Sequence, residues 1–214
     1  MERLTMALTK GRLEKKIIQI FEQAGFDCSP LKEESRRLVH PLPDYPLDVV
    51  LAKAADVITY VERGVCDLGV VGKDTILEQG RSFYEVLDLG FGKCKFALAT
   101  RKGADLYGGL RDLRIATKYP NVAKNFFDKK GLNVEIIKID GSVELAPLLG
   151  LADAIVDIVE TGATLRENGL EVIEYISDIS ARMIVNVASM KMKKSEVGDL
   201  TDRILNVISG KAVG

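Results

Sequence analysis

The sequence predicts an α/β protein of two lobes, with mainly parallel sheets around a cleft. Short apolar segments typical of buried strands alternate with segments of helical period, and glycines end several of the helices. This alternation runs through the chain twice, and strands joined by helical crossovers are parallel. We therefore expect two comparable lobes of about 90 residues each, with a ligand cleft between them.

The first half of the chain alternates strand and helix from its first residues. Strands are expected at residues 4–8, 49–52, 67–72 and 96–100, and helices at residues 13–24 and 55–63. Gly25 and Gly64 follow the two helices as stop signals. The order predicts consecutive βαβ units.

The second half returns to the same order, and it contains a weak internal copy of the first. Strands are expected at residues 114–117, 134–139 and 154–158, and helices at residues 122–130 and 143–149. Gly64-x-x-Asp67 matches Gly150-x-x-Asp153, each before a buried strand. Chance similarity between two βαβ units is the alternative explanation.

The last part of the sequence predicts one more strand and helix. The strand is expected at residues 181–187 and the helix near residues 198–208. We expect this strand to return to the first lobe. Lobe I then comprises residues 1–90 and 184–214, and lobe II comprises residues 91–183.

Composition and charge exclude several function classes. The formal net charge is −1, which argues against a general nucleic-acid-binding polycation. No apolar run reaches the ~18–20 residues of a membrane span, and the first ten residues predict no signal peptide. The spacing of Cys28, Cys66 and Cys94 fits neither a metal site nor a disulfide framework, so we expect a reducing cytoplasm.

The single histidine further limits the possible chemistry. His40 lies in a proline-punctuated segment, where a loop histidine without catalytic role is expected. A metal site with two histidines is excluded. In an enzyme, carboxylates, lysines, arginines and backbone amides would therefore carry the chemistry.

The segment from Ala154 to Leu165 carries the strongest chemical signal. A buried apolar strand contains Asp157 and is followed by a Thr-Gly-Ala-Thr loop and a helix start. Gly162 lets the backbone turn without a side chain in the way, so that the amides of residues 161–164 converge on one point. With the hydroxyls of Thr161 and Thr164, they form an anion cradle sized for a phosphate monoester. Asp157 would accept hydrogen bonds from sugar hydroxyls or hold a metal on them.

The same residues also fit a plain strand-to-helix turn with an N-cap threonine, which needs no ligand. The upstream spacing favours the phosphate cradle. Its fixed positions are Glu144, Gly150, Ala152, Ile155, Asp157, Thr161, Gly162, Thr164 and Leu165. This extended pattern closely resembles the signature of the ATP phosphoribosyltransferase family, which opens histidine biosynthesis.

Three other segments resemble the same family. They are Leu8-Thr9-Lys10-Gly11-Arg12-Leu13, Asp67-Leu68-Gly69-Val70-Val71-Gly72-Lys73-Asp74 and Arg114-Ile115-Ala116-Thr117-Lys118-Tyr119-Pro120. The similarity thus extends from about residue 4 to residue 190. It implies a bilobal fold like that of type II periplasmic binding proteins.

The resemblance also implies an activity, a cofactor and a partner. The family transfers the 5-phosphoribosyl group of phosphoribosyl pyrophosphate (PRPP) to N1 of ATP, with Mg²⁺ and release of pyrophosphate. Longer members continue into a regulatory domain that binds histidine, whereas this sequence ends at Gly214. That length is similar to the short form, a catalytic subunit that works with a separate regulatory subunit resembling histidyl-tRNA synthetase.

Given this resemblance, the second lobe is expected to bind PRPP. Residues Thr161, Gly162, Ala163 and Thr164 would hold the 5-phosphate. The expected catalytic residues are Asp157 on the ribose hydroxyls, Asp153 behind or beside it, and Glu144 near the ribose or its Mg²⁺.

The ATP and pyrophosphate side is expected mainly in the first lobe. Lys10, Gly11 and Arg12 form a strand-to-helix turn whose cations would meet phosphates, the alternative being solvated charge. Asp67 and Gly72 would face the nucleotide, although Asp67 also fits a structural cap. The Tyr119 ring would stack on adenine or cover the cleft or, equally, pack within its lobe.

Three other functions fit parts of the pattern. A type I phosphoribosyltransferase uses a similar loop but two adjacent acids, whereas Val156 precedes Asp157 here. A non-catalytic bilobal binding module would carry an export signal or a DNA-binding helix pair, and neither is visible. A degenerate subunit would not need the retained Lys10-Gly11-Arg12 turn and loop acids.

Overall fold

The computed structural model describes residues 2–33, 36–80, 82–108 and 112–210. It divides into unit 1, which comprises the described residues up to Gly92 and from Ser180 onward, and unit 2, Lys93–Ile179. The second boundary differs from the expected one at residues 183 and 184. That expectation would cut strand β11 (Ala181–Val185), whose every residue pairs with β4 (Leu68–Gly72) of unit 1.

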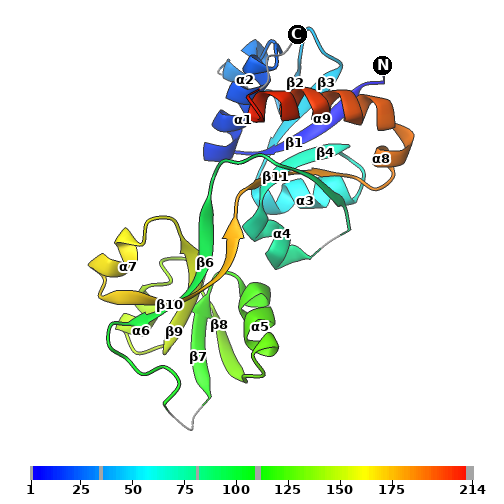
Figure 1. Cartoon of the computed structure of the whole chain (residues 1–214). Helices are drawn as coiled ribbons and strands as arrows, with labels where there is room; N and C mark the ends of the chain where they lie inside the picture. Colours follow the sequence, from blue (N-terminus) through cyan, green and yellow to red (C-terminus); the bar gives the residue numbers. More distant parts are fainter. Residues whose placement is uncertain (1, 34–35, 81, 109–111, 211–214) are drawn as a thin grey trace. The chain divides into compact units, whose positions relative to one another are not determined.

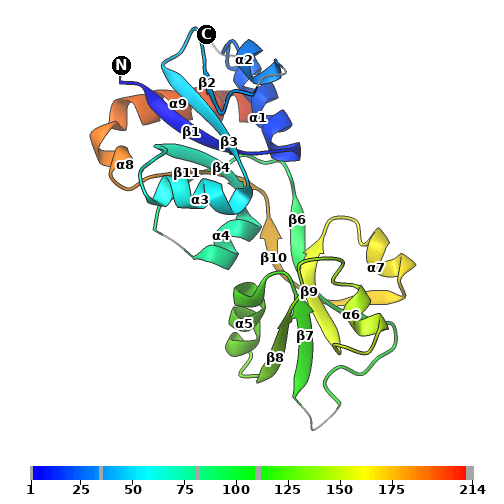
Figure 2. The ribbon, with the colours of Figure 1, turned by 180° about the vertical axis from the view of Figure 1, so that it is seen from behind.

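Unit 1 contains one sheet of described strands with helices on both faces. Its other strands are β1 (Leu4–Thr9), β2 (Val39–Pro41), β3 (Leu47–Ala52) and β5 (Tyr84–Asp88), in the order β2-β3-β1-β4-β11-β5. Its helices are α1 (Arg12–Gln23), α2 (Ser29–Lys32), α3 (Ala54–Glu62), α4 (Lys73–Gln79), α8 (Ser189–Met192) and α9 (Lys194–Ile208). Figure 1 and Figure 2 view this sheet from opposite sides.

Alternation along the strands of unit 1 explains why helices cover both faces. Met6 of β1 packs into the core with Phe21 of α1 and Leu200 of α9, all fully buried. Ala7, the next residue, points to the other face and packs with Val57 of α3. Both faces of the central strands are therefore apolar, which accounts for their continuous hydrophobic runs.

Unit 2 is a second sheet of described strands with its own helices. The strands are β6 (Cys94–Arg101), β7 (Leu113–Thr117), β8 (Val134–Lys138), β9 (Ala154–Val159) and β10 (Leu170–Ile179), in the order β10-β6-β9-β7-β8. Helix α5 (Pro120–Lys129) packs on β7 and β8, while α6 (Leu145–Leu148) packs on β6 and β9 and α7 (Ala163–Glu167) on β10. Ile155 and Val159 of β9 share a core with Ala116 of β7 and Leu165 of α7.

The two sheets are mixed rather than mainly parallel, so that part of the predicted fold is wrong. Parallel pairs join β1 to β3 and β4, and β7 to β8 and β9. The strands β6 and β11, which lie next to the two crossings of the chain between the units, run antiparallel to β9 and β4. In the sequence, a helix between two strands predicts that the strands are parallel. A strand that enters its sheet without a preceding crossover helix gives no such signal, so its antiparallel direction could not be predicted.

Two smaller findings complete the fold. His40 lies in strand β2 rather than in a loop; its ring is buried, and Nδ1 lies 2.8 Å from the carbonyl oxygen of Pro30. This contact is structural, as expected for a histidine without a catalytic role. Within the described residues, no helix combines the length and apolar character that crossing a membrane requires.

Candidate active site

A cavity of about 260 Å³ lies where strand β9 gives way to helix α7. Its lining comprises Glu144, Asp157 and residues 158–165. Because β9 and β7 are parallel, the cavity is at the carboxyl edge of both strands. Ligands of α/β proteins bind at this edge. The sequence-predicted cradle, its acid Asp157 and Glu144 are thus brought together.

The loop that closes the cavity takes its shape from a glycine. Gly162 has φ of 72° and ψ of 9°, a left-handed conformation that other residues adopt at a cost. The Ala163 N–H donates to Thr161 Oγ1 at 3.3 Å, so Thr161 caps the turn. Arg166 donates from Nη1 to the Thr161 carbonyl at 3.0 Å. Helix α7 begins directly after Gly162, and the N–H groups of a first helical turn lack intrahelical partners.

Glu144 and Asp157, two of the three acids in the lining, give the cavity a strong electrostatic character. Asp157 accepts a hydrogen bond from the Ile158 N–H at 2.8 Å. Burial raises the pKa of Asp157, this hydrogen bond lowers it, and the nearby charge of Glu144 raises it further. Such a pair attracts cations and accepts hydrogen bonds from hydroxyl groups.

Lys118 is a neighbour of this site that sequence reasoning missed. Its positive charge acts on Asp157 and lowers the pKa of that carboxyl. In the sequence, Lys118 is one of several lysines that follow apolar strands. Only the register of β7 against β9, which pairs Thr117 with Val156, brings Lys118 to the level of Asp157.

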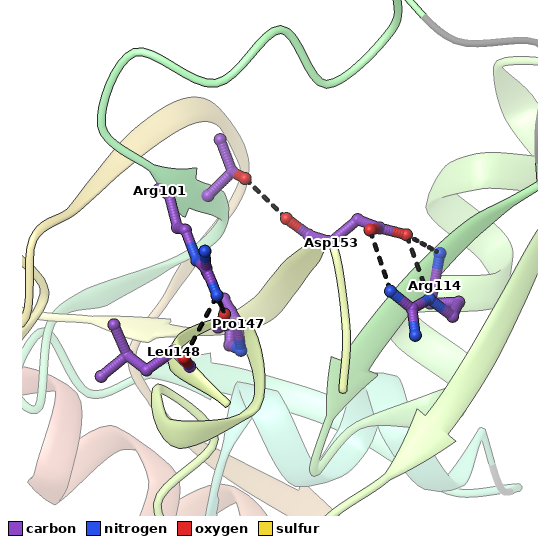
Figure 3. Close-up of polar contacts among 6 residues, drawn as sticks. Arg101, Arg114, Pro147, Leu148 and Asp153 are labelled. Atoms are coloured by element: carbon purple, nitrogen blue, oxygen red, sulfur yellow. Dashed lines mark hydrogen bonds and ion pairs between the residues drawn. The ribbon is translucent and has the colours of Figure 1, made fainter. Parts of the chain in front are cut away.

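Asp153 does not stand beside Asp157, so its expected position is wrong. It precedes β9 and accepts from the Arg114 N–H at 2.9 Å and from Arg114 Nη2 at 3.2 Å (Figure 3). Four residues of extended strand separate it from Asp157, about 13 Å. Asp153 lines a different cavity of about 270 Å³, together with Arg114 and Arg101, and Arg101 donates to the carbonyl oxygens of Pro147 and Leu148 (Figure 3). In the structure Asp153 thus holds Arg114, and its predicted place next to the ribose has no support from this position.

Asp67 has the contacts of a structural cap, the alternative that the sequence also allowed. It lies before β4, at the opposite end of the strand from Gly72, and is buried. Its carboxylate accepts from the Thr5 N–H at 2.9 Å, from Ser189 Oγ at 2.7 Å and from Lys193 Nζ at 2.9 Å. These contacts use the acceptor capacity that a ligand would need.

The Lys10-Gly11-Arg12 turn lies at the carboxyl edge of the sheet of unit 1. The Lys10 N–H donates to the Ala52 carbonyl at 2.9 Å, and the Gly11 N–H donates to Glu14 Oε2 at 2.9 Å. Gly11 has φ of 99° and ψ of −127°, which favours glycine strongly. The side chains of Lys10 and Arg12 are exposed at the start of α1.

Gly72 and Tyr119 occupy helix starts in different units. Gly72 ends β4 and directly precedes α4 in unit 1. Tyr119 precedes α5 in unit 2, where its ring packs edge-on against Phe96 with centroids 4.8 Å apart. The Tyr119 ring thus packs within its own unit, and its stacking on adenine stays a prediction.

This combination defines a class of protein. A carboxylate on a strand lies next to a loop that carries hydroxyl groups and turns at a glycine, and this arrangement in an α/β unit suits an anionic phosphosugar.

A sequence model of the family described as HisG, ATP phosphoribosyltransferase, matches residues 53–206. The ATP phosphoribosyltransferases of Clostridium kluyveri and Clostridium acetobutylicum are 60% and 57% identical over 202 and 205 residues. These alignments cover 94% and 96% of this chain, and 92% and 95% of the two relatives.

The chain belongs to the ATP phosphoribosyltransferase family, which confirms the resemblance drawn from its motifs. It is an enzyme of the first step of histidine biosynthesis, which joins the 5-phosphoribosyl group of PRPP to N1 of ATP and releases pyrophosphate.

Solved structures agree with the fold. The ATP phosphoribosyltransferase (HisG:HisZ) complex from Thermotoga maritima contains a chain with a TM-score of 0.84 and 36% identity, covering 97% of this chain and 100% of that one. The periplasmic aliphatic sulphonate binding protein SsuA from Escherichia coli has a TM-score of 0.62 at 13% identity, covering 98% and 69%. At this identity the second match concerns the fold alone, and it confirms the expected likeness to periplasmic binding proteins.

Proposed function

We propose that the loop Thr161–Thr164 holds the 5-phosphate of PRPP and that Asp157 holds the ribose hydroxyls. The observation that carries this proposal is that Asp157 and the loop line one cavity at the carboxyl edge of β9. The N–H groups at the start of α7, of which that of Ala163 contacts Thr161 Oγ1 in the structure, and the Thr161 and Thr164 hydroxyls suit a phosphate monoester. A carboxylate next to them suits the adjoining sugar, since it accepts hydrogen bonds only.

In the reaction, the bond between ribose C1 and the diphosphate oxygen breaks, and its electron pair leaves with the diphosphate. The lone pair of ATP N1 forms the new bond to C1, and the adenine returns to neutrality by losing its 6-amino proton to solvent. The protein mainly orients the reactants and stabilises charge. Asp157 orients the ribose and, as an anion, stabilises the positive charge that develops on it.

Glu144 and Asp157 fit an Mg²⁺ bound together with PRPP. The Glu144 charge raises the pKa of Asp157, so the two carboxylates repel each other, and an Mg²⁺ ion held by them would relieve this repulsion. Within the described residues, no three or more His, Cys, Asp or Glu side chains cluster as a metal site. Mg²⁺ accepts most of its ligands from substrate phosphates and water, and it neutralises diphosphate charge.

Unit 1 would supply the contacts to the phosphates of ATP or pyrophosphate. β1 and β4 are parallel, so the Lys10-Gly11-Arg12 turn and Gly72 lie at the same edge of this sheet. Two cations beside a glycine turn suit phosphate oxygens. Gly72 directly precedes α4, and the Asp74 carboxylate fills the place that a Cβ of residue 72 would take, so a side chain there would displace Asp74.

The chain would act in the cytoplasm, where PRPP and ATP are available, with a regulatory subunit that resembles histidyl-tRNA synthetase. The Thermotoga maritima chain with which it shares 36% identity was solved as a HisG:HisZ complex, which supports a partner of that kind. Mixing the chain with such a subunit and measuring the sedimentation of the mixture tests the assembly. Separate sedimentation together with full activity of the chain alone would contradict it.

The test of the site is Asp157→Asn, which keeps the shape of the side chain and removes its charge. We expect kcat for phosphoribosylation of ATP to fall about 100-fold, because stabilisation of the reacting ribose is lost. The matched control is Asp178→Asn on β10, where the side chain is 84% exposed. Near-normal turnover of Asp157→Asn would remove this residue from the mechanism.

A second measurement separates catalysis from binding alone. Calorimetry with ribose 5-phosphate measures the affinity that the phosphate loop and the sugar contacts provide, without any reaction. Binding of PRPP without pyrophosphate release, also in the presence of the regulatory subunit, would identify a non-catalytic binding module instead.

A further inference from the structure

The proposed PRPP cavity has an unbalanced charge. Its lining contains the carboxylates of Glu144, Asp157 and Glu160 and, among the described residues, no lysine or arginine. PRPP is itself a polyanion, with a phosphate at C5 and a diphosphate at C1. A bound Mg²⁺ ion would offset part of this negative charge. The leaving diphosphate gains further negative charge as its bond to C1 breaks. A cation close to the cavity is therefore expected.

The register of the sheet places one lysine beside Asp157. Ala116 of β7 pairs with Ile155 of β9, and both side chains lie in the core shared with α7. Side chains two residues further along a strand point to the same face. Asp157 follows Ile155 by two residues within β9, and Lys118 follows Ala116 by two residues as the first residue after β7, which places Lys118 next to Asp157 at the carboxyl edge of the two strands.

Lys118 is also available to a ligand. Its side chain is exposed, and no hydrogen bond or ion pair of its ammonium group occurs among the described residues. In contrast, Lys138, which ends the next strand β8, lies 3.7 Å from Asp140. The charge of Lys118 reaches Asp157, whose pKa it lowers.

The order of the strands decides which part of PRPP Lys118 faces. Asp157 belongs to β9, Lys118 follows the neighbouring strand β7, and β6 flanks β9 on its other side. Helix α7, which starts at the phosphate loop, packs on β10 beyond β6. Asp157 thus stands between the loop and Lys118. A ribose held by Asp157 with its C5 phosphate in the loop directs C1 toward β7, because C1 and C5 substituents extend from opposite ends of the sugar.

We propose that Lys118 is a catalytic residue that binds the diphosphate of PRPP and neutralises it as it leaves. This inference rests on the proposed PRPP site. The ammonium group donates to diphosphate oxygens and takes no part in bond making: the electron pair of the C1–O bond stays on the diphosphate, and no proton moves to or from Lys118. A lysine suits this role, because its point charge follows an oxygen that moves away from C1.

The experiment compares two ligands on the full chain in the presence of Mg²⁺. Pyrophosphate probes the leaving-group position, and ribose 5-phosphate probes the loop and Asp157 without a diphosphate. For Lys118→Met, we expect the Kd of pyrophosphate to rise roughly 10- to 100-fold, as for loss of a charged hydrogen bond. The Kd of ribose 5-phosphate should change less than about twofold. Lys118→Arg should recover most of the pyrophosphate affinity, and Lys124→Met on the surface of α5 is the matched control.

The KM for pyrophosphate is a second measurement, and it would not change if Lys118 had only a structural role. In the reverse reaction, Lys118→Met should raise the KM for pyrophosphate, while its thermal unfolding matches that of the wild type. Unchanged pyrophosphate affinity, or an equal loss for ribose 5-phosphate, would overturn the assignment of Lys118. Failure of ribose 5-phosphate to bind the wild type would instead refute the proposed PRPP site, which keeps the two results apart.

Discussion

Asp67 and Asp153 hold equivalent positions in the two units. Each precedes a central strand, and its carboxylate accepts the backbone N–H of the residue near the start of the neighbouring parallel strand. The donors are Thr5 and Arg114, both at 2.9 Å. The backbone N–H groups of the two acids donate in return to the carbonyls of Thr5 and Arg114, at 2.8 Å in both cases. The weak internal copy in the sequence thus corresponds to one structural device used twice.

Removing either carboxylate should destabilise the protein without removing the reaction. For Asp67→Ala we expect a loss of about 3 kcal/mol in the free energy of unfolding, because buried partners lose their acceptor. For Asp153→Ala, whose partner Arg114 is more exposed, we expect about 2 kcal/mol. Thermal unfolding measures both effects.

The kinetics of the same variants test the corrected assignment of these acids. Assayed well below the unfolding temperature, each variant should keep kcat within about threefold of the wild type, because neither carboxylate lines the proposed PRPP cavity. A 100-fold fall in kcat with unchanged stability would return Asp153 to the catalytic residues.

Gly162 provides a second prediction. Gly162→Val should weaken PRPP binding at least about tenfold, since a β-branched residue resists the left-handed conformation that shapes the loop. A Cβ at this position would also lie 3.0 Å from Arg166 Nη1, where it would disturb the contact with Thr161. Calorimetry with PRPP measures the affinity.

Gly169 supplies the matched control for this prediction. It has φ of 67°, close to that of Gly162, and no heavy atom lies within 4 Å of an added Cβ. Gly169→Val carries the same backbone strain outside the cavity, so its stability should fall while its PRPP affinity stays near the wild-type value. Equal affinities for both variants would show that the loop does not hold the phosphate.

The central strands, their helices and the edge strand β8 could be predicted from the sequence, whereas the edge strands β2, β5 and β10 could not. β4 is a continuous apolar run and β9 is apolar except for Asp157, because helices cover both faces of these strands. The edge strand β10 mixes Glu171 and Glu174 with apolar residues and contains register shifts, so its pattern follows no single period. Its partner strand β6 fixes it through long-range pairing that is invisible in a local window.

The acids of the site show a similar limit. An acid within or after an apolar strand, such as Asp157, reaches the carboxyl edge, whereas one before the strand, such as Asp153, lies at the opposite edge. The direction of the strand therefore separates a site residue from a structural one, and this distinction was available from the sequence. The position of Lys118 was not, because it depends on the register between β7 and β9.

The three cysteines give the last prediction, which concerns thiol reactivity. Burial raises the pKa of both Cys28 and Cys66 to about 11, with nearby acids adding to the shift, Glu22 for Cys28 and Asp67 for Cys66. Burial disfavours the charged thiolate, so at pH 8 only about one molecule in a thousand carries it at either position. Cys94 is only partly buried.

In the folded protein at pH 8, a thiol reagent should therefore label Cys94 first, and Cys28 and Cys66 only as the protein unfolds. Mass spectrometry of the labelled peptides identifies the sites, and Cys94→Ser should abolish the fast phase. Rapid labelling of Cys28 in the native protein would contradict the burial that sets its pKa.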